Sequence, residues 1–308
     1  MAIVTPQLPP ALTRHRAALR LGPTEYTLLT GLGRYIYLTA AQSTRRAYQP
    51  GSLRFVQKRL AGLVDAGYGQ RHLGFTQSGK PPDVFSLTAK GWEAVRELGM
   101  ETPARWRPSE AAQRGFLAYA HDLAVADFGI AAERFCTAMA PRADLAQFRH
   151  HRILQADPLQ VRLADGRTHR VIFDAWLDLR LTRGEPPQQR QRALALELDR
   201  ASEYQQVWRR KITATLAASA SGYATHFGTT SLTVVVVCPG NARRVDQLLA
   251  WTEEQLRTED AEGAARLLAF TDVDPGTVDP RALFLAPCWR VPFQRDATAL
   301  VTLDSPGP

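Results

Sequence analysis

Apolar residues recur at near-helical spacing close to the start of the chain. The segment PTEYTLLTGLGRYIYL begins with Pro23, a residue favoured at the first position of a helix. A second, short helix is predicted from Thr39, a good N-cap. A third follows Ser52 in LRFVQKRLAGLVDAGY, where Gly67 ends the apolar stripe. Three successive helices are therefore expected in this part of the chain.

Two short runs with strand-like character come after the third helix. GQRHLGFT and DVFSLT flank the segment QSGKPP, and a further helix is predicted in AKGWEAVREL. Helix, helix, helix, hairpin and helix is the order of a winged helix-turn-helix. In such a module the third helix enters the major groove of DNA, and the hairpin touches the backbone or the minor groove. We therefore predict a winged helix over residues 24–99.

The longer C-terminal part alternates between helical and strand-like patterns. An amphipathic helix is predicted in FLAYAHDLAVADFGIAAERFCTAM. VRLADGRTHRVIFDAWLDLRL is predicted to form two strands joined at Asp165-Gly166, with Asp174 in the second. A strand is then expected in ALALELD, a helix from about Ser202, and a strand in SLTVVVVCPG. A further helix is expected in ARRVDQLLAWTEEQLRT and a last strand in ARLLAFTDV. This order predicts a mixed sheet with helices on its faces, and it matches the core of restriction-endonuclease-like nucleases.

The length of 308 residues suits two domains. The segment METPARWRPSEAAQRG is rich in Pro, Arg and small residues and is typical of a linker. The expected fold class is α/β (α+β overall), with a winged helix followed by a restriction-endonuclease-like domain. The predicted organisation is an N-terminal extension at 1–23, the winged helix at 24–99, the linker at 100–115, the nuclease-like α/β domain at 116–300 and a flexible tail at 301–308.

Composition excludes several classes of protein. Hydrophobic residues make up 45% of the chain, enough for sizeable cores, yet no apolar run is long enough to span a bilayer. The N-terminus has no continuous apolar stretch behind a basic start, so a signal peptide is not expected. The three cysteines are scattered and form neither a disulfide framework nor a zinc-binding spacing. A cytoplasmic protein without a membrane partner is therefore expected.

The formal net charge of +8 is concentrated in the N-terminal third of the chain. Residues 1–107 hold 3 Lys and 12 Arg against 6 Asp or Glu, a net charge of +9, so the remaining residues sum to −1. This asymmetry is typical of a nucleic-acid-binding module. The candidates for contact with double-stranded DNA are Arg45 and Arg46 on the second helix, Arg54, Gln57, Lys58 and Arg59 on the third, and Arg71 and Lys80 on the hairpin. The alternatives are a solvated basic face on a helical adaptor domain, and an arginine bias set by a GC-rich genome.

Acidic residues gather near the ends of the predicted strands. Glu197 and Asp199 close the strand ALALELD, where alternation puts them on one face, and Asp174 lies in the preceding strand. With Glu133 of the long helix, they form a candidate set of ligands for Mg²⁺ or Mn²⁺. Lys211, on the next helix, is a candidate for stabilising the charge that develops in catalysis. No other cofactor is expected.

A purely structural role for these acids is the alternative. Carboxylates at strand ends often cap a following helix, as Asp199 would here, or pair with nearby arginines. Asp178 also rivals Asp174 as a candidate, because it lies on the same face of the same strand.

Several segments together resemble the replication-relaxation family of plasmid and mobile-element proteins. They are RYIYLTAAQSTRRAY, SLRFVQKRLAGLVDAGY, FSLTAKGWEAV, HDLAVADFGIAA, FDAWLDL and LALELDRASEYQQVWRRKITAT, spread over roughly residues 24–240. The resemblance implies a winged helix joined to a nuclease-like fold, with Glu197, Asp199 and Lys211 matching the family's acidic pair and following lysine. The nuclease motif usually ends Glu-x-Lys, and because Asp199 stands at the lysine position here, Lys211 would take that role.

Three hypotheses on function follow. The first is a DNA-binding protein of a plasmid or mobile element that acts in replication or DNA relaxation, with replication or transfer proteins as further partners. The second is a Mg²⁺-dependent nuclease or nickase that uses Asp174, Glu197, Asp199 and Lys211. The third is a transcriptional regulator that binds a palindromic site as a homodimer.

Overall fold

The chain folds as a mixture of helices and strands in a computed structural model, which describes residues 21–72, 82–103, 116–164, 166–184, 186–200 and 203–303. It contains a mixed five-stranded sheet, a three-stranded sheet and a two-stranded hairpin. The predicted α/β class is therefore confirmed. No described helix is both long and apolar enough to cross a membrane.

The N-terminal elements follow the order that the hydrophobic pattern predicts, with one short strand added. They are α1 (Pro23–Tyr35), β1 (Leu38–Thr39), α2 (Ala40–Ala47), α3 (Leu53–Asp65), β2 (Gly69–His72), β3 (Val84–Leu87) and α4 (Ala89–Glu97). The three strands form an antiparallel sheet in the order β1-β3-β2. Thr39 caps α2, because its hydroxyl accepts a hydrogen bond from the backbone N–H of Gln42. The tip between β2 and β3 lies outside the described residues.

The large sheet has the strand order β10-β9-β8-β7-β4. Its strands are β4 (Ala143–His150), β7 (Ala175–Arg183), β8 (Gln188–Leu198), β9 (Thr233–Val237) and β10 (Leu268–Thr271). β4, β7 and β8 pair in antiparallel fashion, whereas β8, β9 and β10 run parallel. The mixed sheet expected from the sequence is thus present.

Three details of this sheet differ from the sequence prediction. The strand β4 was not expected, and β8 begins at Gln188, before the predicted strand ALALELD. The second strand of the predicted hairpin divides into β6 (Thr168–Val171), which pairs with β5 (Leu159–Arg162), and β7, which pairs with β4 and β8. Asp174 therefore lies just before β7 and not inside a strand.

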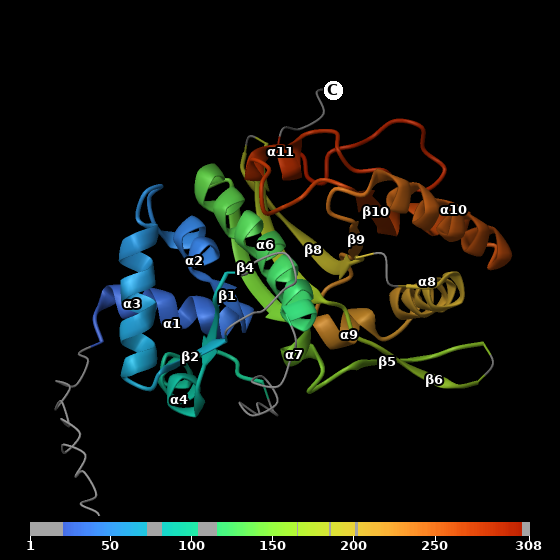
Figure 1. The fold of residues 1–308 in the computed structure, drawn as a ribbon. Coiled ribbons are helices and arrows are strands. Elements are labelled where there is room, and N and C mark those ends of the chain that lie inside the picture. Colours follow the sequence, from blue (N-terminus) through green and yellow to red (C-terminus); the bar gives the residue numbers. More distant parts are fainter. Residues whose placement is uncertain are drawn as a thin grey trace, which may run out of the picture.

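Helices cover both faces of the large sheet (Figure 1). α6 (Phe116–Met139) and α11 (Pro280–Leu285) pack on one face, where they share a core with Leu194 and Leu196 of β8. α8 (Gln205–Ala220), α9 (Tyr223–Phe227) and α10 (Ala242–Thr258) pack on the other, together with Ala193 and Ala195. Successive residues of β8 thus enter opposite cores, as the alternation of a buried strand requires. The short helix α7 (His151–Leu154) follows β4 directly.

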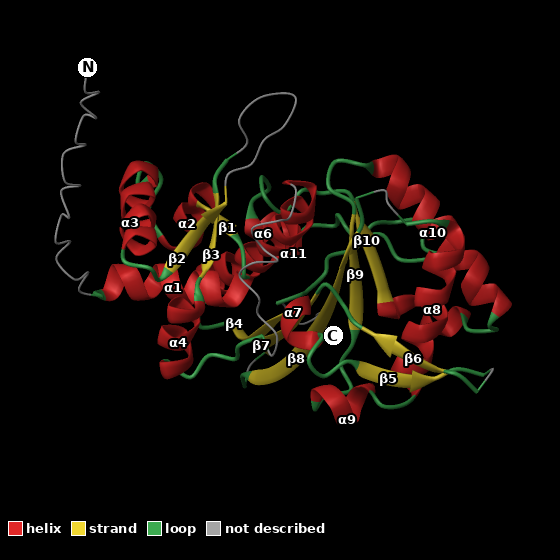
Figure 2. Cartoon of the chain, turned by 60° about the horizontal axis from the view of Figure 1, so that its bottom comes forward, coloured by secondary structure: helices red, strands yellow, loops and turns green. Residues whose placement is uncertain are grey.

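The long helix α6 lies between the N-terminal helices and the large sheet (Figures 1 and 2). Leu123 and Ile130 belong to the same core as the N-terminal helices, whereas Phe128 and Phe135 belong to the core on the sheet. Both cores therefore share one helix.

Candidate functional site

Three of the predicted site residues converge where β7 begins and β8 ends. The pairing of Ala175 with Leu196 in the antiparallel ladder brings Asp174 opposite Glu197. The Asp174 carboxylate accepts a hydrogen bond of 2.8 Å from the backbone N–H of Leu198. Nζ of Lys211, on α8, lies 2.7 Å from Oε2 of Glu197. The structure thus brings Asp174, Glu197 and Lys211 together from two strands and a helix.

Two residues that were not among the predicted site residues complete this cluster. Nε2 of His121, on α6, lies 3.1 Å from Oδ1 of Asp174. Oε1 of Glu203 lies 2.5 Å from Nζ of Lys211. His121 belongs to the HDL run that contributes to the family resemblance, so the sequence held a signal for its position but none for its partner. Glu203 stands in the connection before α8, where no periodic pattern singles it out.

Burial and neighbouring charges shift the pKa values of the residues in this cluster. Burial raises the pKa of Glu197 to about 7, although Lys211 opposes this rise. Burial alone would lower the pKa of Lys211, but the carboxylates of Glu197 and Glu203 raise it instead. Burial also opposes ionisation of Asp174, yet the hydrogen bond from His121 and the nearby charges lower its pKa. That hydrogen bond raises the pKa of His121.

Asp199 lies on the same sheet face as Glu197 but contacts a different helix. Glu197 contacts α8, while Oδ2 of Asp199 accepts hydrogen bonds of 2.7 and 3.2 Å from the buried guanidinium of Arg244 on α10. Asp178, the rival of Asp174, contacts Arg180 at 2.7 Å within β7. Both aspartates are buried, and the ion pair that each forms with an arginine offsets the cost of burying its charge.

Glu133 lies apart from the other predicted metal ligands. It forms ion pairs with Arg34 of α1 and with Arg46 of α2, the latter at 2.7 Å from Nε to Oε2. Because an α-helix rises about 1.5 Å per residue, Glu133 is roughly 18 Å along α6 from His121. One ion cannot contact both ends of that distance, so the structure does not bring Glu133 to the cluster.

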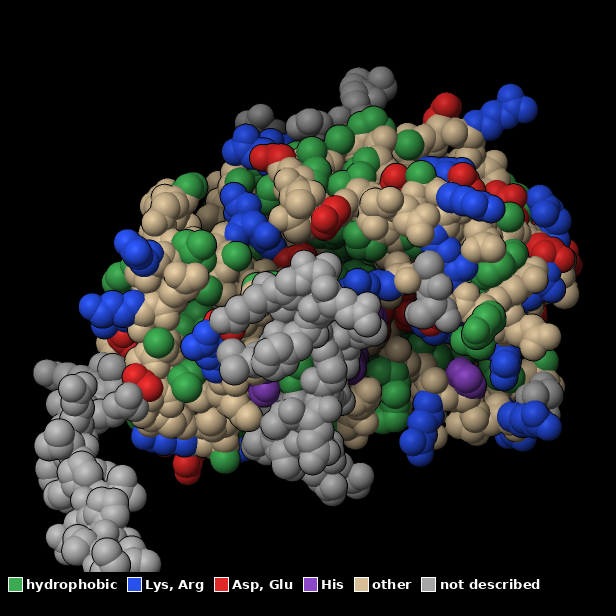
Figure 3. Space-filling model, viewed as in Figure 1, with side chains coloured by type: hydrophobic (Ala, Val, Ile, Leu, Met, Phe, Trp, Pro, Cys, Tyr) green, Lys and Arg blue, Asp and Glu red, His purple; other side chains and the backbone are tan. Residues whose placement is uncertain are grey.

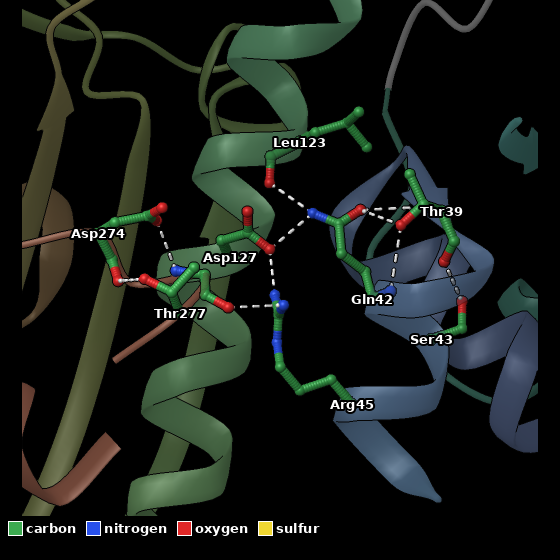
Figure 4. A network of polar contacts seen from close by, with 9 residues as sticks. Thr39, Gln42, Ser43, Arg45, Leu123, Asp127, Asp274 and Thr277 are labelled. Carbon is green, nitrogen blue, oxygen red and sulfur yellow. Dashed lines mark hydrogen bonds and ion pairs between the residues drawn. The ribbon is translucent and has the colours of Figure 1, made fainter. Parts of the chain in front are cut away.

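Arg45, like Arg46, binds α6. Arg45 pairs with Asp127 of α6 (Figure 4). It also donates a hydrogen bond of 2.8 Å to the carbonyl of Gly276. Gln42 donates to the same carboxylate at 2.7 Å and to the carbonyl of Leu123 at 2.8 Å. These contacts join α2 to α6 and to the segment after β10. Phosphate contact by Arg45 and Arg46 stays a prediction, since both guanidinium groups bind α6 in this structure.

The third helix presents the other candidates for DNA contact. Arg54, Gln57 and Lys58 are exposed on α3. Arg59 is also exposed, with Nη1 3.2 Å from Oε1 of Glu25. On the space-filling surface, basic side chains are visible at the end of the molecule where α3 lies, and both there and at the opposite end acidic side chains lie among them (Figure 3).

The hairpin candidates are described only in part. Arg71, on β2, is exposed and pairs with Asp83, just before β3. Lys80 lies outside the described residues.

Comparison with known proteins gives one match. A family model described as replication-relaxation matches residues 29–232, which is well over half of the chain. No curated protein and no solved structure matches.

Proposed function

The chain belongs to the replication-relaxation family, and from this membership we propose that it binds the DNA of a plasmid or mobile element in replication or DNA relaxation. Residues 24–99 would act as a winged helix, with α3 in the major groove of double-stranded DNA and the β2–β3 hairpin near the backbone. Replication or transfer proteins would be its further partners, and the cytoplasm its location.

The exposed basic face of α3 is the observation that carries this proposal. Arg54 and Lys58 are one helical turn apart, so their side chains lie on the same side of α3. Neither forms an ion pair with any described residue. Free cationic groups on one helix face suit phosphate oxygens and the acceptor edge of guanine.

Salt-dependent binding to DNA tests this proposal. The affinity of the full chain for duplex DNA is measured over a series of salt concentrations, for the wild type, Arg54→Ala and Lys58→Ala. Log affinity falls as log salt rises, and removing a residue that neutralises one phosphate should make this slope less steep by about 1. Arg243→Ala is the matched control, because it removes an exposed charge from α10. Equal slopes in all four proteins would contradict a DNA-binding role for α3.

A second candidate function is a metal-dependent DNA nuclease or nickase, which the convergence of Asp174, Glu197 and Lys211 favours. The carboxylate oxygens of Asp174 and Glu197 are the donors that Mg²⁺ and Mn²⁺ prefer, so the residues present fit such an ion. When bound, the ion would hold a water molecule and a phosphate oxygen for in-line attack. Lys211 would stabilise negative charge on the phosphate, and His121 would orient Asp174.

Incubation with supercoiled plasmid in Mg²⁺, Mn²⁺ or EDTA tests this second function. If the cluster is catalytic, strand breaks require the divalent ion. Asp174→Asn, Glu197→Gln and Lys211→Ala should each slow nicking by about 100-fold or more. Asp178→Asn, which changes the rival acid on β7, should nick at nearly the wild-type rate. Plasmid that stays intact but shifts in a gel would reject the nuclease and leave the DNA-binding protein.

A further inference from the structure

A second cluster of chemically capable side chains lies beside the Asp174 cluster. It consists of Asp122 on α6, His150 at the end of β4 and His151 at the start of α7. One possible ligand atom from each residue lies within 4.8 Å of the other two. Asp122 and His150 are buried, with 2% and 0% of their surfaces exposed, and His151 is half-buried. Three segments distant in sequence thus place three potential metal ligands together.

Two ring nitrogens in this cluster have no hydrogen-bond partner within the described part of the chain. Nε2 of His150 and Nδ1 of His151 are buried, and neither has a partner among the described residues. A buried polar atom left without a hydrogen bond destabilises the folded state, so native structures rarely keep two of them side by side. A bound ion would satisfy both nitrogens at once.

The protonation of the two histidines suits a metal ion. Burial, with the positive charge of the neighbouring Arg152, holds the pKa of His150 well below its usual value. Burial also lowers the pKa of His151. Both rings are therefore neutral near pH 7, the form in which imidazole binds metals. Nδ1 of His150 accepts a long hydrogen bond of 3.4 Å from the backbone N–H of Arg152, so binding of a metal at Nε2 requires the ring proton to move to Nδ1 in place of that contact.

The Asp122 carboxylate is oriented towards the histidines. Its Oδ2 contacts Nη2 of Arg152 at 3.3 Å, and its Oδ1 lies 3.8 Å from Nδ1 of His151. An arginine that holds the outer oxygen of a ligating carboxylate is a common supporting contact in metal sites. Asp122 offsets the positive charge that Arg152 brings to the cluster, and the Asp174 carboxylate, bonded to His121, lies nearby.

We propose that Asp122, His150 and His151 bind one transition-metal ion of the Zn²⁺ class. Two neutral imidazoles and one carboxylate are ligands that Zn²⁺ accepts, whereas Mg²⁺ and Ca²⁺ are bound mainly by oxygen. Three protein ligands leave the fourth tetrahedral position to water. The ion would connect α6 to the β4–α7 corner. The proposal does not depend on DNA binding or on cleavage by the Asp174 cluster.

Binding of Co²⁺, used as a spectroscopic substitute for Zn²⁺, tests this site. The full chain, prepared without a histidine tag and freed of metal with EDTA, is titrated with Co²⁺ and then with Zn²⁺. The wild type should develop visible d–d absorption that saturates at one equivalent and disappears as Zn²⁺ displaces Co²⁺. His150→Ala, His151→Ala and Asp122→Asn should each weaken Co²⁺ binding by about tenfold or more.

Two control variants separate this site from other histidines and acids. His226→Ala removes a half-buried histidine whose Nδ1 lies 4.0 Å from Asp157, and it should leave the Co²⁺ spectrum unchanged. Asp178→Asn should also leave it unchanged, because Asp178 pairs with Arg180 within β7 and belongs to neither cluster. If His150→Ala does not fold, as judged by circular dichroism, the less buried His151→Ala decides. No d–d absorption in the wild type, or equal affinity in His151→Ala, would overturn the proposal.

Discussion

At the scale of single residues, His72 shows how a buried histidine makes the stability of the fold depend on pH. Its Nε2 is 2.8 Å from the hydroxyl of Ser86, and its Nδ1 is 3.3 Å from the hydroxyl of Tyr119 on α6. Burial lowers the pKa of His72 below the ordinary value of 6.5. Between these two pKa values the unfolded chain binds a proton at this position and the folded chain does not.

The stability of the protein should therefore fall as the solution is acidified below about pH 6.5. The stabilising contribution of neutral His72 is present above that pH and is lost progressively towards the pKa of the folded state. His72→Gln keeps a polar group near Ser86 but removes the titration. Urea denaturation at several pH values should show a smaller slope for His72→Gln, by at most about 1.4 kcal/mol per pH unit. Parallel profiles for the two proteins would contradict this reasoning.

Charged residues show what a sequence reveals about a site and what it does not. The pattern placed Glu197 and Asp199 on one sheet face, and the contacts with α8 and α10 agree. The pattern could not assign the partner of each carboxylate, because the sequence does not distinguish an acid that binds a metal ion from one that pairs with an arginine. Glu133 and Asp199 pair with arginines that lie 87 and 45 positions away. Such distant pairing depends on the three-dimensional packing.

At the scale of elements, Gly129 determines how closely α6 approaches its neighbours. A Cβ atom at this position would lie 2.5 Å from Cε1 of Tyr35 and 2.6 Å from Cε2 of Phe148. Those distances are well inside van der Waals contact. The ring centroids of Tyr35, on α1, and Phe148, on β4, lie 4.9 Å apart. Because the two rings pack against each other, neither can move freely to make room for the Cβ atom.

Gly129→Ala should therefore destabilise the protein by about 1–3 kcal/mol through overpacking, despite the better helix propensity of alanine. Gly62→Ala on α3 is the matched control, since a Cβ atom there meets nothing within 4 Å. That variant should gain up to about 1 kcal/mol from the same propensity. Chemical denaturation of both variants measures the difference, and a gain for Gly129→Ala would show that α6 packs less tightly than described.

The elements themselves were predictable to different degrees. Helices with a clear apolar stripe, such as α3 and α10, agree with the pattern, as does the continuous apolar run of β9. β4 was missed because only its two end residues are buried, so it has no strict alternation. The start of β8 was missed because its first residues, QQRQR, are polar and exposed or half-buried. In both cases pairing with β7 stabilises a strand that the hydrophobic pattern of its own residues does not predict.

At the scale of the whole molecule, α6 makes the N-terminal elements dependent on the rest of the chain. Tyr119, Leu123, Ala126 and Ile130 complete the core that the N-terminal helices and strands form. A fragment that ends before α6 would expose the apolar surfaces that these four side chains cover.

A fragment of residues 21–103 should therefore unfold at a lower urea concentration than the full chain, or show no cooperative transition. Losing four buried apolar side chains from one core removes several kcal/mol of burial, at about 1.5–3 kcal/mol for each large residue. Circular dichroism and urea denaturation of the fragment and the full chain provide the comparison. An equal transition midpoint would show that residues 24–99 fold as an independent domain.

The ion pairs between α2 and α6 also constrain how the sequence can change over evolution. On α6, Glu133 binds Arg46 of α2 as well as Arg34 of α1, and Asp127 binds Arg45 of α2, so α2 and α6 carry opposite charges at matching positions. Replacing Glu133 with a neutral residue would leave two partly buried guanidinium groups without their carboxylate. Relatives that lose the acid at position 133 should therefore also lose the arginine at position 46. The two positions are expected to vary together, although 87 positions separate them in the chain.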